Sequence, residues 1–200
     1  IRKASEAPKC SATGSGTSGH FVPKLLEEAL GLKFNLVMGY QGGSEQDLAL
    51  ERGEVVCRAL SIPTFYSRAP FDNWGKSNLV RVLLQTAMKR DPRAADAPTI
   101  YELMKAYKTP ESTQQLVHSV LASGDIGRPF FAPPNVPPDR VKILRSALEK
   151  TVYDAEFLDD AKKKRLNVDP TSGEELEKIA REAVSQPADL VERMKKILGQ

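Results

Sequence analysis

The 200-residue sequence is poor in the residues that build disulfide frameworks and metal centres, with two cysteines and two histidines. Cys10 and Cys57 are too few for a disulfide framework, and they neither establish nor exclude an oxidising compartment. His20 and His118 belong to no cluster of His, Cys, Asp or Glu with metal-ligand spacing. We therefore expect no metal site and no cofactor.

Long apolar runs and a strong excess of either charge are also absent. No stretch of about 18 apolar residues occurs, so the sequence contains no candidate transmembrane segment. The net charge is +3, from 29 basic and 26 acidic residues. The basic runs at residues 162–165 and 195–196 are interleaved with acidic residues in helical patterns, which indicates solvated helix faces. We expect no nucleic-acid partner.

The first half of the sequence alternates short strands with helices. We expect strands at residues 8–13, 34–38, 54–59 and 79–85, the last being largely apolar and therefore central in its sheet. The first helix is expected to end at Gly31. The second should begin at Ser44, which forms a capping-box pattern with Asp47. This β-α-β-α-β order predicts an α/β fold with a mainly parallel sheet flanked by helices.

The second half is predicted to be helical. Helices are expected at residues 99–107, 110–121 and 139–152, and at the end of the chain, where Leu190 and Ile197 lie on one apolar side. Another helix is expected after Ser172, which with Glu175 forms its N-terminal cap. Residues 128–134 form an extended apolar segment bounded by prolines, consistent with an edge or crossover strand. One strand cannot cover so many apolar helix faces. The C-terminal helices therefore either wrap the first-half sheet or lack their natural partner.

A glycine-rich loop at residues 14–19 joins the first strand to the first helix. Glycines permit a tight turn that exposes backbone N–H groups, and Ser or Thr at the helix start adds hydroxyl donors. The helix N-terminus contributes about half a positive charge. These features predict an anion site that needs no charged side chain. A plain glycine turn followed by an ordinary N-cap is the alternative interpretation.

Other uses of such a loop fit less well. The spacing matches the G-x-G-x-x-G dinucleotide fingerprint, but the first strand is polar and residues 38–41 lack the expected acidic residue. His20 and Phe21 replace the Lys-Ser/Thr of a P-loop, and a nucleophile elbow at Ser18 lacks its second glycine. A Cys10–His20 catalytic dyad is a further alternative, although a small buried thiol is the usual explanation for a cysteine within a strand. A carboxylate, which accepts several converging N–H and O–H bonds, suits the loop best.

Six segments resemble, in the same order, motifs of the substrate-binding receptors of tripartite tricarboxylate transporters. Residues 12–20 (ATGSGTSGH) resemble the carboxylate loop of that family's second lobe, and residues 39–45 (GYQGGSE) resemble its G-Y-K-G-x-x-E turn. Residues 48–55 (LALERGEV) are similar to its L-A-M-E-R-G-E-V segment, although Val56 and Cys57 replace the following Asp-Gly, so no ligand contact is carried over there. The other segments lie at residues 84–99, 128–141 and 168–175.

This resemblance implies a type II periplasmic-binding-protein-like fold, in which two α/β lobes close on a ligand. It implies a periplasmic receptor and not an enzyme, with a small organic carboxylate as ligand and the membrane subunits of the transporter as partners. Residues 1–95 would form the second lobe, and residues 96–200 a crossover and a helical segment that completes the first. Because family members usually begin with a first lobe carrying its own carboxylate loop, we expect this chain to be a truncated piece that binds weakly.

The resemblance and the glycine loop together nominate ligand-binding residues at successive strand-to-helix turns. The candidates are Gly14, Ser15, Gly16, Thr17, Ser18 and His20 of the glycine loop, Tyr40, Gly42, Gly43 and Ser44 of the next turn, and Arg58 near the end of the third strand. Arg128 is a weaker candidate, and an ordinary surface ion pair is the alternative role for Arg58. Two other functions stay open: a nucleotide-binding α/β enzyme and the ligand-sensing domain of a regulator.

Overall fold

The computed structural model describes residues 4–67, 69–125, 129–164, 166 and 168–200. The chain divides into two units. One contains the residues up to Leu121 together with Pro187–Gln200, and the other contains Ala122–Gln186. The predicted division into residues 1–95 and 96–200, with the second part completing another lobe, stays a prediction.

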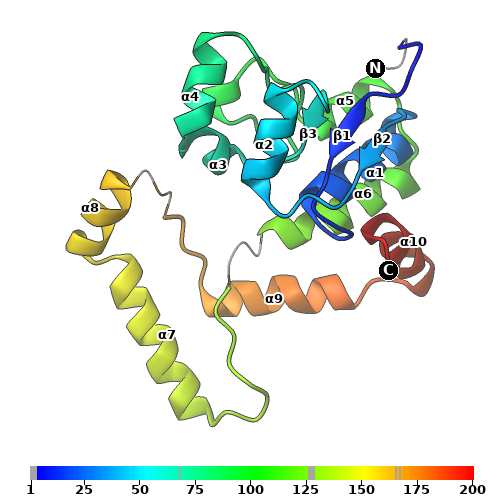
Figure 1. Cartoon of the computed structure of the whole chain (residues 1–200). Coiled ribbons are helices and arrows are strands. Elements are labelled where there is room, and N and C mark those ends of the chain that lie inside the picture. Colours follow the sequence, from blue (N-terminus) through cyan, green and yellow to red (C-terminus); the bar gives the residue numbers. More distant parts are fainter. Residues whose placement is uncertain (1–3, 68, 126–128, 165, 167) are drawn as a thin grey trace. The chain divides into compact units, whose positions relative to one another are not determined.

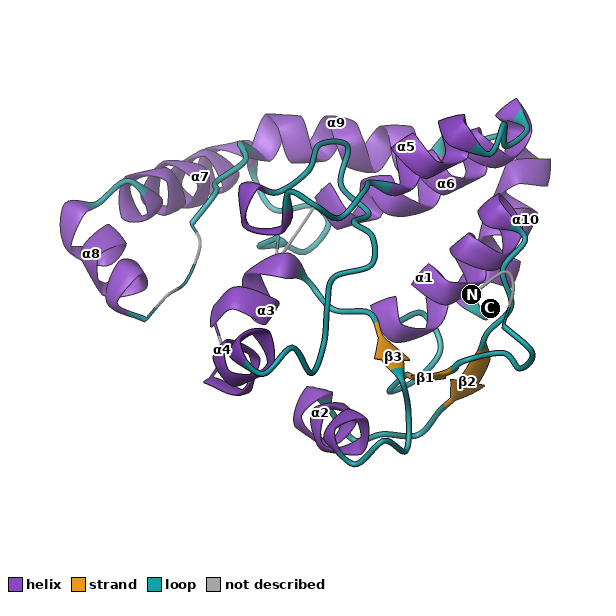
Figure 2. Cartoon of the chain, turned by 90° about the horizontal axis from the view of Figure 1, so that it is seen from above, coloured by secondary structure: helices purple, strands orange, loops and turns teal. Residues whose placement is uncertain are grey.

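A three-stranded parallel sheet lies within the first unit (Figure 1). Its strands are β1 (Lys9–Ser11), β2 (Asn35–Val37) and β3 (Cys57–Arg58), in the order β2-β1-β3. Helix α1 lies on one side of these strands and helix α2 on the other (Figure 2), so the central strand is buried at Cys10 and Ser11. The predicted α/β class and parallel pairing are confirmed, with strands shorter than predicted.

The prediction of a fourth strand at residues 79–85 is wrong. Residues 80–84 belong to no helix or strand, and Gln85 makes a single isolated bridge to Thr99. Leu79 and Leu83 are about half exposed, at 50% and 48%. An apolar run becomes a central strand only when neighbouring strands satisfy its backbone groups on both edges. The two-residue strand β3 pairs with β1 and gives this run no such neighbour.

The crossover strand predicted at residues 128–134 is likewise not formed in its described part, residues 129–134. Phe130 and Phe131 are 83% and 87% exposed there. The prolines at 129, 133 and 134 carry no backbone N–H, so this segment has few donors for a strand ladder.

The first unit contains most of the helices. They are α1 (Ser18–Leu30), α2 (Gly43–Glu51), α3 (Ile62–Ser67), α4 (Ala69–Lys76), the 3-10 turn η1 (Pro92–Ala94), α5 (Ile100–Ala106), α6 (Glu111–Asp125), which begins in this unit, and α10 (Ala188–Leu198). No helix among the described residues has the length and apolar character that a membrane crossing requires.

The core of the first unit forms around α1. Its buried leucines, Leu25, Leu26 and Leu30, join one cluster with buried side chains of α5, α6 and α10. Full burial of one leucine contributes about 1.5–3 kcal/mol, so this cluster is the main source of stability in the unit. Leu190 and Ile197 belong to it, which confirms the predicted apolar side of the last helix. Gly31 ends α1 at a left-handed φ of 62°, as predicted.

Of the two predicted serine caps, one is confirmed and the other is wrong. Ser172 caps α9 (Gly173–Val184) by accepting the amide of Glu175 at 3.2 Å. Ser44 does not cap α2, because that helix begins one residue earlier with Gly42 as its N-cap. Asp47, the expected partner of Ser44, instead pairs with Arg58.

The second unit consists of α7 (Pro138–Val152), α8 (Ala155–Lys163) and α9, which confirms the helices predicted at residues 139–152 and after Ser172. Arg145 of α7 binds Glu174 and Glu177 of α9 at 2.6 and 3.3 Å. Among the described residues of this unit, Ala161 alone is buried. Its helices therefore have almost no apolar core of their own.

Close contact between α1 and β1 explains one glycine of the loop. A Cβ at Gly19 would lie 2.8 Å from the carbonyl oxygen of Ser11 and 3.0 Å from Cα of Ala12. These are backbone atoms, so they cannot rotate away. Only glycine lets the first turn of α1 approach the end of β1 this closely.

We expect Gly19→Ala to lower the free energy of unfolding by about 1–3 kcal/mol, because the added methyl group overpacks this contact. Gly14→Ala is the matched control, since a Cβ at Gly14 would meet nothing within 4 Å. The control should change stability by less than about 0.5 kcal/mol. Urea unfolding of both variants measures the difference, and equal midpoints would contradict the close-packing role of Gly19.

Candidate functional site

The glycine-rich loop makes a tight turn between β1 and α1. Gly16 has a φ of 74°, a left-handed conformation that disfavours any residue with a side chain. The Thr17 hydroxyl closes the turn by donating to the carbonyl oxygen of Gly14 at 2.7 Å. Thr17 is also the N-cap of α1, but its side chain accepts no bond from that helix. The first turn of α1 is therefore left without a side-chain cap.

A pocket of about 320 Å³ lies where β1 and β3 end. Three chain segments surround it: the glycine loop with the start of α1, the start of α2, and the segment that follows β3. Its lining residues are Thr13, Thr17, Ser18, Gly19, Gly43, Gln46, Arg58, Ala59, Leu60, Ser61 and Thr64. All of them belong to the first unit. This is the edge of the sheet where the C-terminal ends of parallel strands are expected to bind ligands.

Hydrogen-bond donors are concentrated around this pocket. The N-caps of α1 and α2, Thr17 and Gly42, provide no side-chain bond to their helices. No hydrogen bond to the amides of Ser18 or Gly19 occurs within the described parts of the chain. The first turns of two helices thus bring N–H groups and positive dipole ends to the same pocket, together with several hydroxyl groups.

Arg58 is the one charged residue among the described residues that line the pocket. Its guanidinium pairs with Asp47, and the two side chains are 9% and 7% exposed. Nη1 of Arg58 also donates to the carbonyl oxygen of Gly43 at 2.7 Å. The surface ion pair considered for Arg58 is therefore a buried pair. Because Asp47 balances its charge, the donors that the pocket offers to an anion are mainly neutral ones.

The structure brings together some of the predicted site residues and separates others. Thr17, Ser18, Gly43 and Arg58 line the pocket, whereas the remaining candidates do not: Gly14, Ser15, Gly16, His20, Tyr40, Gly42 and Ser44. Arg128 lies outside the described residues. Ligand contact by any of these residues stays a prediction.

Ser15 and His20 lie beside the C-terminal end of α10. A Cβ at Gly199, the C-cap of that helix, would lie 3.0 Å from Cε1 of His20 and 3.0 Å from Cβ of Ser15. Nδ1 of His20 is buried and has no hydrogen-bond partner among the described residues. One part of the loop therefore packs on α10 while Thr17 and Ser18 line the pocket.

Several pocket residues were missed by sequence reasoning. Thr13 and Gly19 lie within the glycine-loop motif, next to the nominated residues. Gln46 lies one helical turn after Gly43, so helical spacing could have nominated it. The segment from Ala59 to Thr64 carries no motif, and only the fold brings it to the pocket.

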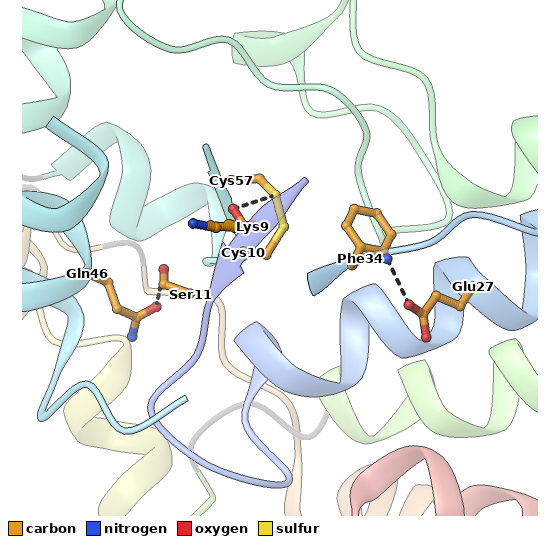
Figure 3. Close-up of a disulfide and its surroundings, with 7 residues drawn as sticks. All are labelled: Lys9, Cys10, Ser11, Glu27, Phe34, Gln46 and Cys57. Carbon is orange, nitrogen blue, oxygen red and sulfur yellow. Dashed lines mark hydrogen bonds between the residues drawn. A yellow bond between two sulfur atoms is a disulfide. The ribbon is translucent and has the colours of Figure 1, made fainter. Parts of the chain in front are cut away.

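A disulfide joins the two cysteines, Cys10 of β1 and Cys57 of β3 (Figure 3). Their Cα atoms are 4.5 Å apart and are partners in the strand register. Cys10 is buried, as expected, but it is not a free thiol, so the Cys10–His20 dyad is not formed. In the described part of the chain, no group of three or more His, Cys, Asp or Glu side chains could hold a metal ion.

A second pocket of about 380 Å³ lies between α3, α4 and the loop segment that follows α4. It is lined by Phe65, Tyr66, Phe71, Gly75, Lys76, Val80, Arg81 and Val82. Burial raises the pKa of Tyr66, and the Asp91 charge raises it further. None of the predicted site residues lines this pocket.

Comparison with known families gives one match. The family described as tripartite tricarboxylate transporter family receptor matches residues 4–196. No curated protein and no solved structure matches the chain. Receptors of this family are extracytoplasmic binding proteins with a periplasmic-binding-protein-like fold, and they are not enzymes, so the nucleotide-binding enzyme is set aside. The match covers nearly the whole chain, and the protein belongs to the tripartite tricarboxylate transporter receptor family.

Proposed function

We propose that the protein captures an organic di- or tricarboxylate in the periplasm for the membrane subunits of a tripartite tricarboxylate transporter. The observation that carries this proposal is the convergence of two helix N-termini, without side-chain caps, on one pocket. A carboxylate accepts several hydrogen bonds at once and complements the positive ends of both helix dipoles.

The proposed ligand contacts are the hydroxyl of Ser18 and the backbone amides of Ser18 and Gly19. These groups start α1, and no partner within the described residues occupies the two amides. A hydrogen bond to a charged group is worth about 1.5–3 kcal/mol. Three such bonds at the upper end of this range total about 9 kcal/mol. After about 5 kcal/mol is subtracted for the entropic cost of association, they support binding in the range of about 1 mM.

We expect the pocket to distinguish between anionic ligands by the geometry of their hydrogen-bond acceptors more than by their charge. Arg58 is already paired with Asp47, so the lining adds no net side-chain charge among the described residues. An anion with few acceptors would leave donors unsatisfied, and leaving a buried donor unpaired costs about 1–3 kcal/mol. A multidentate carboxylate avoids this cost.

A thermal-shift screen with citrate, succinate and benzoate up to about 10 mM tests this function. At about ten times the dissociation constant, a ligand stabilises the folded state by about 1.4 kcal/mol. For a domain of this size the melting temperature should rise by about 3–6 °C. Sodium chloride at matched ionic strength is the control. The absence of any shift beyond this control, for every acid, would overturn the proposal.

Ser18→Ala should weaken binding of the stabilising acid about tenfold, because a charge-assisted bond is lost. Ser15→Ala is the matched control in the same loop. Ser15 lies beside Gly199 and not in the pocket, so its replacement should leave the dissociation constant unchanged. Isothermal titration of both variants decides which side of the loop holds the ligand. Loss of affinity in Ser15→Ala alone would place the ligand elsewhere.

A further inference from the structure

The N-terminal turn of α2 is held by two residues that face each other across β1 and β3. Ser11 and Arg58 are partners in the strand register. The Ser11 hydroxyl donates to Oε1 of Gln46 at 3.2 Å, and both side chains are buried (Figure 3). Arg58 donates to the carbonyl oxygen of Gly43 at 2.7 Å and pairs with Asp47. This one strand pair therefore holds three of the residues that begin α2.

The disulfide lies one position before this pair. Cys10 and Cys57 are the preceding partners in the register, and the β1–β3 ladder contains only these two pairs. A ladder this short contributes few backbone hydrogen bonds. The covalent bond between Cys10 and Cys57 is thus the strongest link that keeps Ser11 opposite Arg58.

We propose that the Cys10–Cys57 disulfide holds the pocket in its binding shape through Ser11 and Arg58, so that reduction weakens carboxylate binding. This inference rests on the proposed function. Under this proposal, Arg58 is a positioning residue. Its guanidinium pairs with Asp47 and donates to the carbonyl oxygen of Gly43, and these contacts fix the start of α2 beside the ligand.

The redox step is an ordinary exchange with a dithiol. The reductant supplies two electrons and two protons, the S–S bond breaks, two S–H bonds form, and the dithiol becomes a disulfide. Sγ of Cys57 lies 3.5 Å from the carbonyl oxygen of Lys9, so the new thiol has a hydrogen-bond acceptor in place (Figure 3). Neither cysteine belongs to the hydrophobic cluster around α1, so that cluster is held by contacts of its own.

The first experiment compares oxidised protein with protein reduced by dithiothreitol. Calorimetric titration with citrate, succinate and benzoate should give about tenfold weaker binding for the reduced form, the loss expected when one or two oriented donors are displaced. Hydrogen exchange should be faster at residues 43–47 and unchanged at residues 25–30, which lie in the core. Equal affinity in both forms, or unchanged exchange at residues 43–47, would overturn the inference.

The second experiment keeps the disulfide intact and replaces Asp47, which does not line the pocket. Asp47→Asn should weaken binding about tenfold if Arg58 acts by positioning α2. If Arg58 instead contacts the ligand directly, freeing its charge would tighten binding, and that result would overturn the positioning role. Asp96→Asn, at an exposed aspartate, is the control for the loss of one negative charge.

The two experiments also separate this inference from the proposed function. If no acid binds the oxidised protein, the proposed function fails, while the exchange comparison still decides whether the disulfide holds α2. If the reduced protein loses its helical circular dichroism, Asp47→Asn in the oxidised form decides the positioning step. Unchanged or tighter binding in that variant then overturns the inference.

Discussion

The close approach of α1 to the end of β1 is the contact on which the rest of the first unit depends. Because Gly19 has no side chain, the first turn of α1 lies directly against Ser11 and Ala12. This position directs Ser18 into the pocket at one end of the helix. It also sets the orientation in which Leu25, Leu26 and Leu30 meet the helices of the core. Site and core are therefore coupled through a single helix.

The pocket combines many donors with little net charge. Arg58 and Asp47 neutralise each other, and the ion pair is buried, so its stabilising effect is offset by the cost of desolvation. The pair instead fixes the relative position of two elements, because the guanidinium of Arg58 links β3 to the start of α2 through the carbonyl oxygen of Gly43. Such a pair fixes geometry more than it adds stability, which is what the proposed binding by backbone amides requires.

Local signals in the sequence predicted much of this fold. Gly31 as a helix end, Ser172 as a cap and the alternation of strands with helices depend on neighbouring residues, and all are present. The same reasoning nominated Thr17, Ser18, Gly43 and Arg58, which line the pocket. These residues lie at or after the ends of strands of a parallel sheet, whose C-terminal ends meet at one edge.

What could not be predicted depends on partners far away in the sequence. The apolar run at residues 79–85 has strand character but no strand that pairs with it. Asp47 resembles a capping residue until Arg58 is placed beside it. The disulfide joins positions 47 residues apart, and two isolated cysteines give no sign of their pairing. Residues from Ala59 to Thr64 reach the pocket only because the sheet places them there.

The position of α10 has a consequence for the order of folding. Leu190 and Ile197 complete the core of the first unit, yet the ribosome makes them after all of Ala122–Gln186. During synthesis, the face of α1 that these two residues cover stays exposed or bound by a chaperone until residues 187–200 have been made. The intervening residues add little entropic cost to this return, since each doubling of a flexible loop costs about 0.6 kcal/mol. The delay is therefore kinetic: the first unit can fold cooperatively only after residues 187–200 have been made.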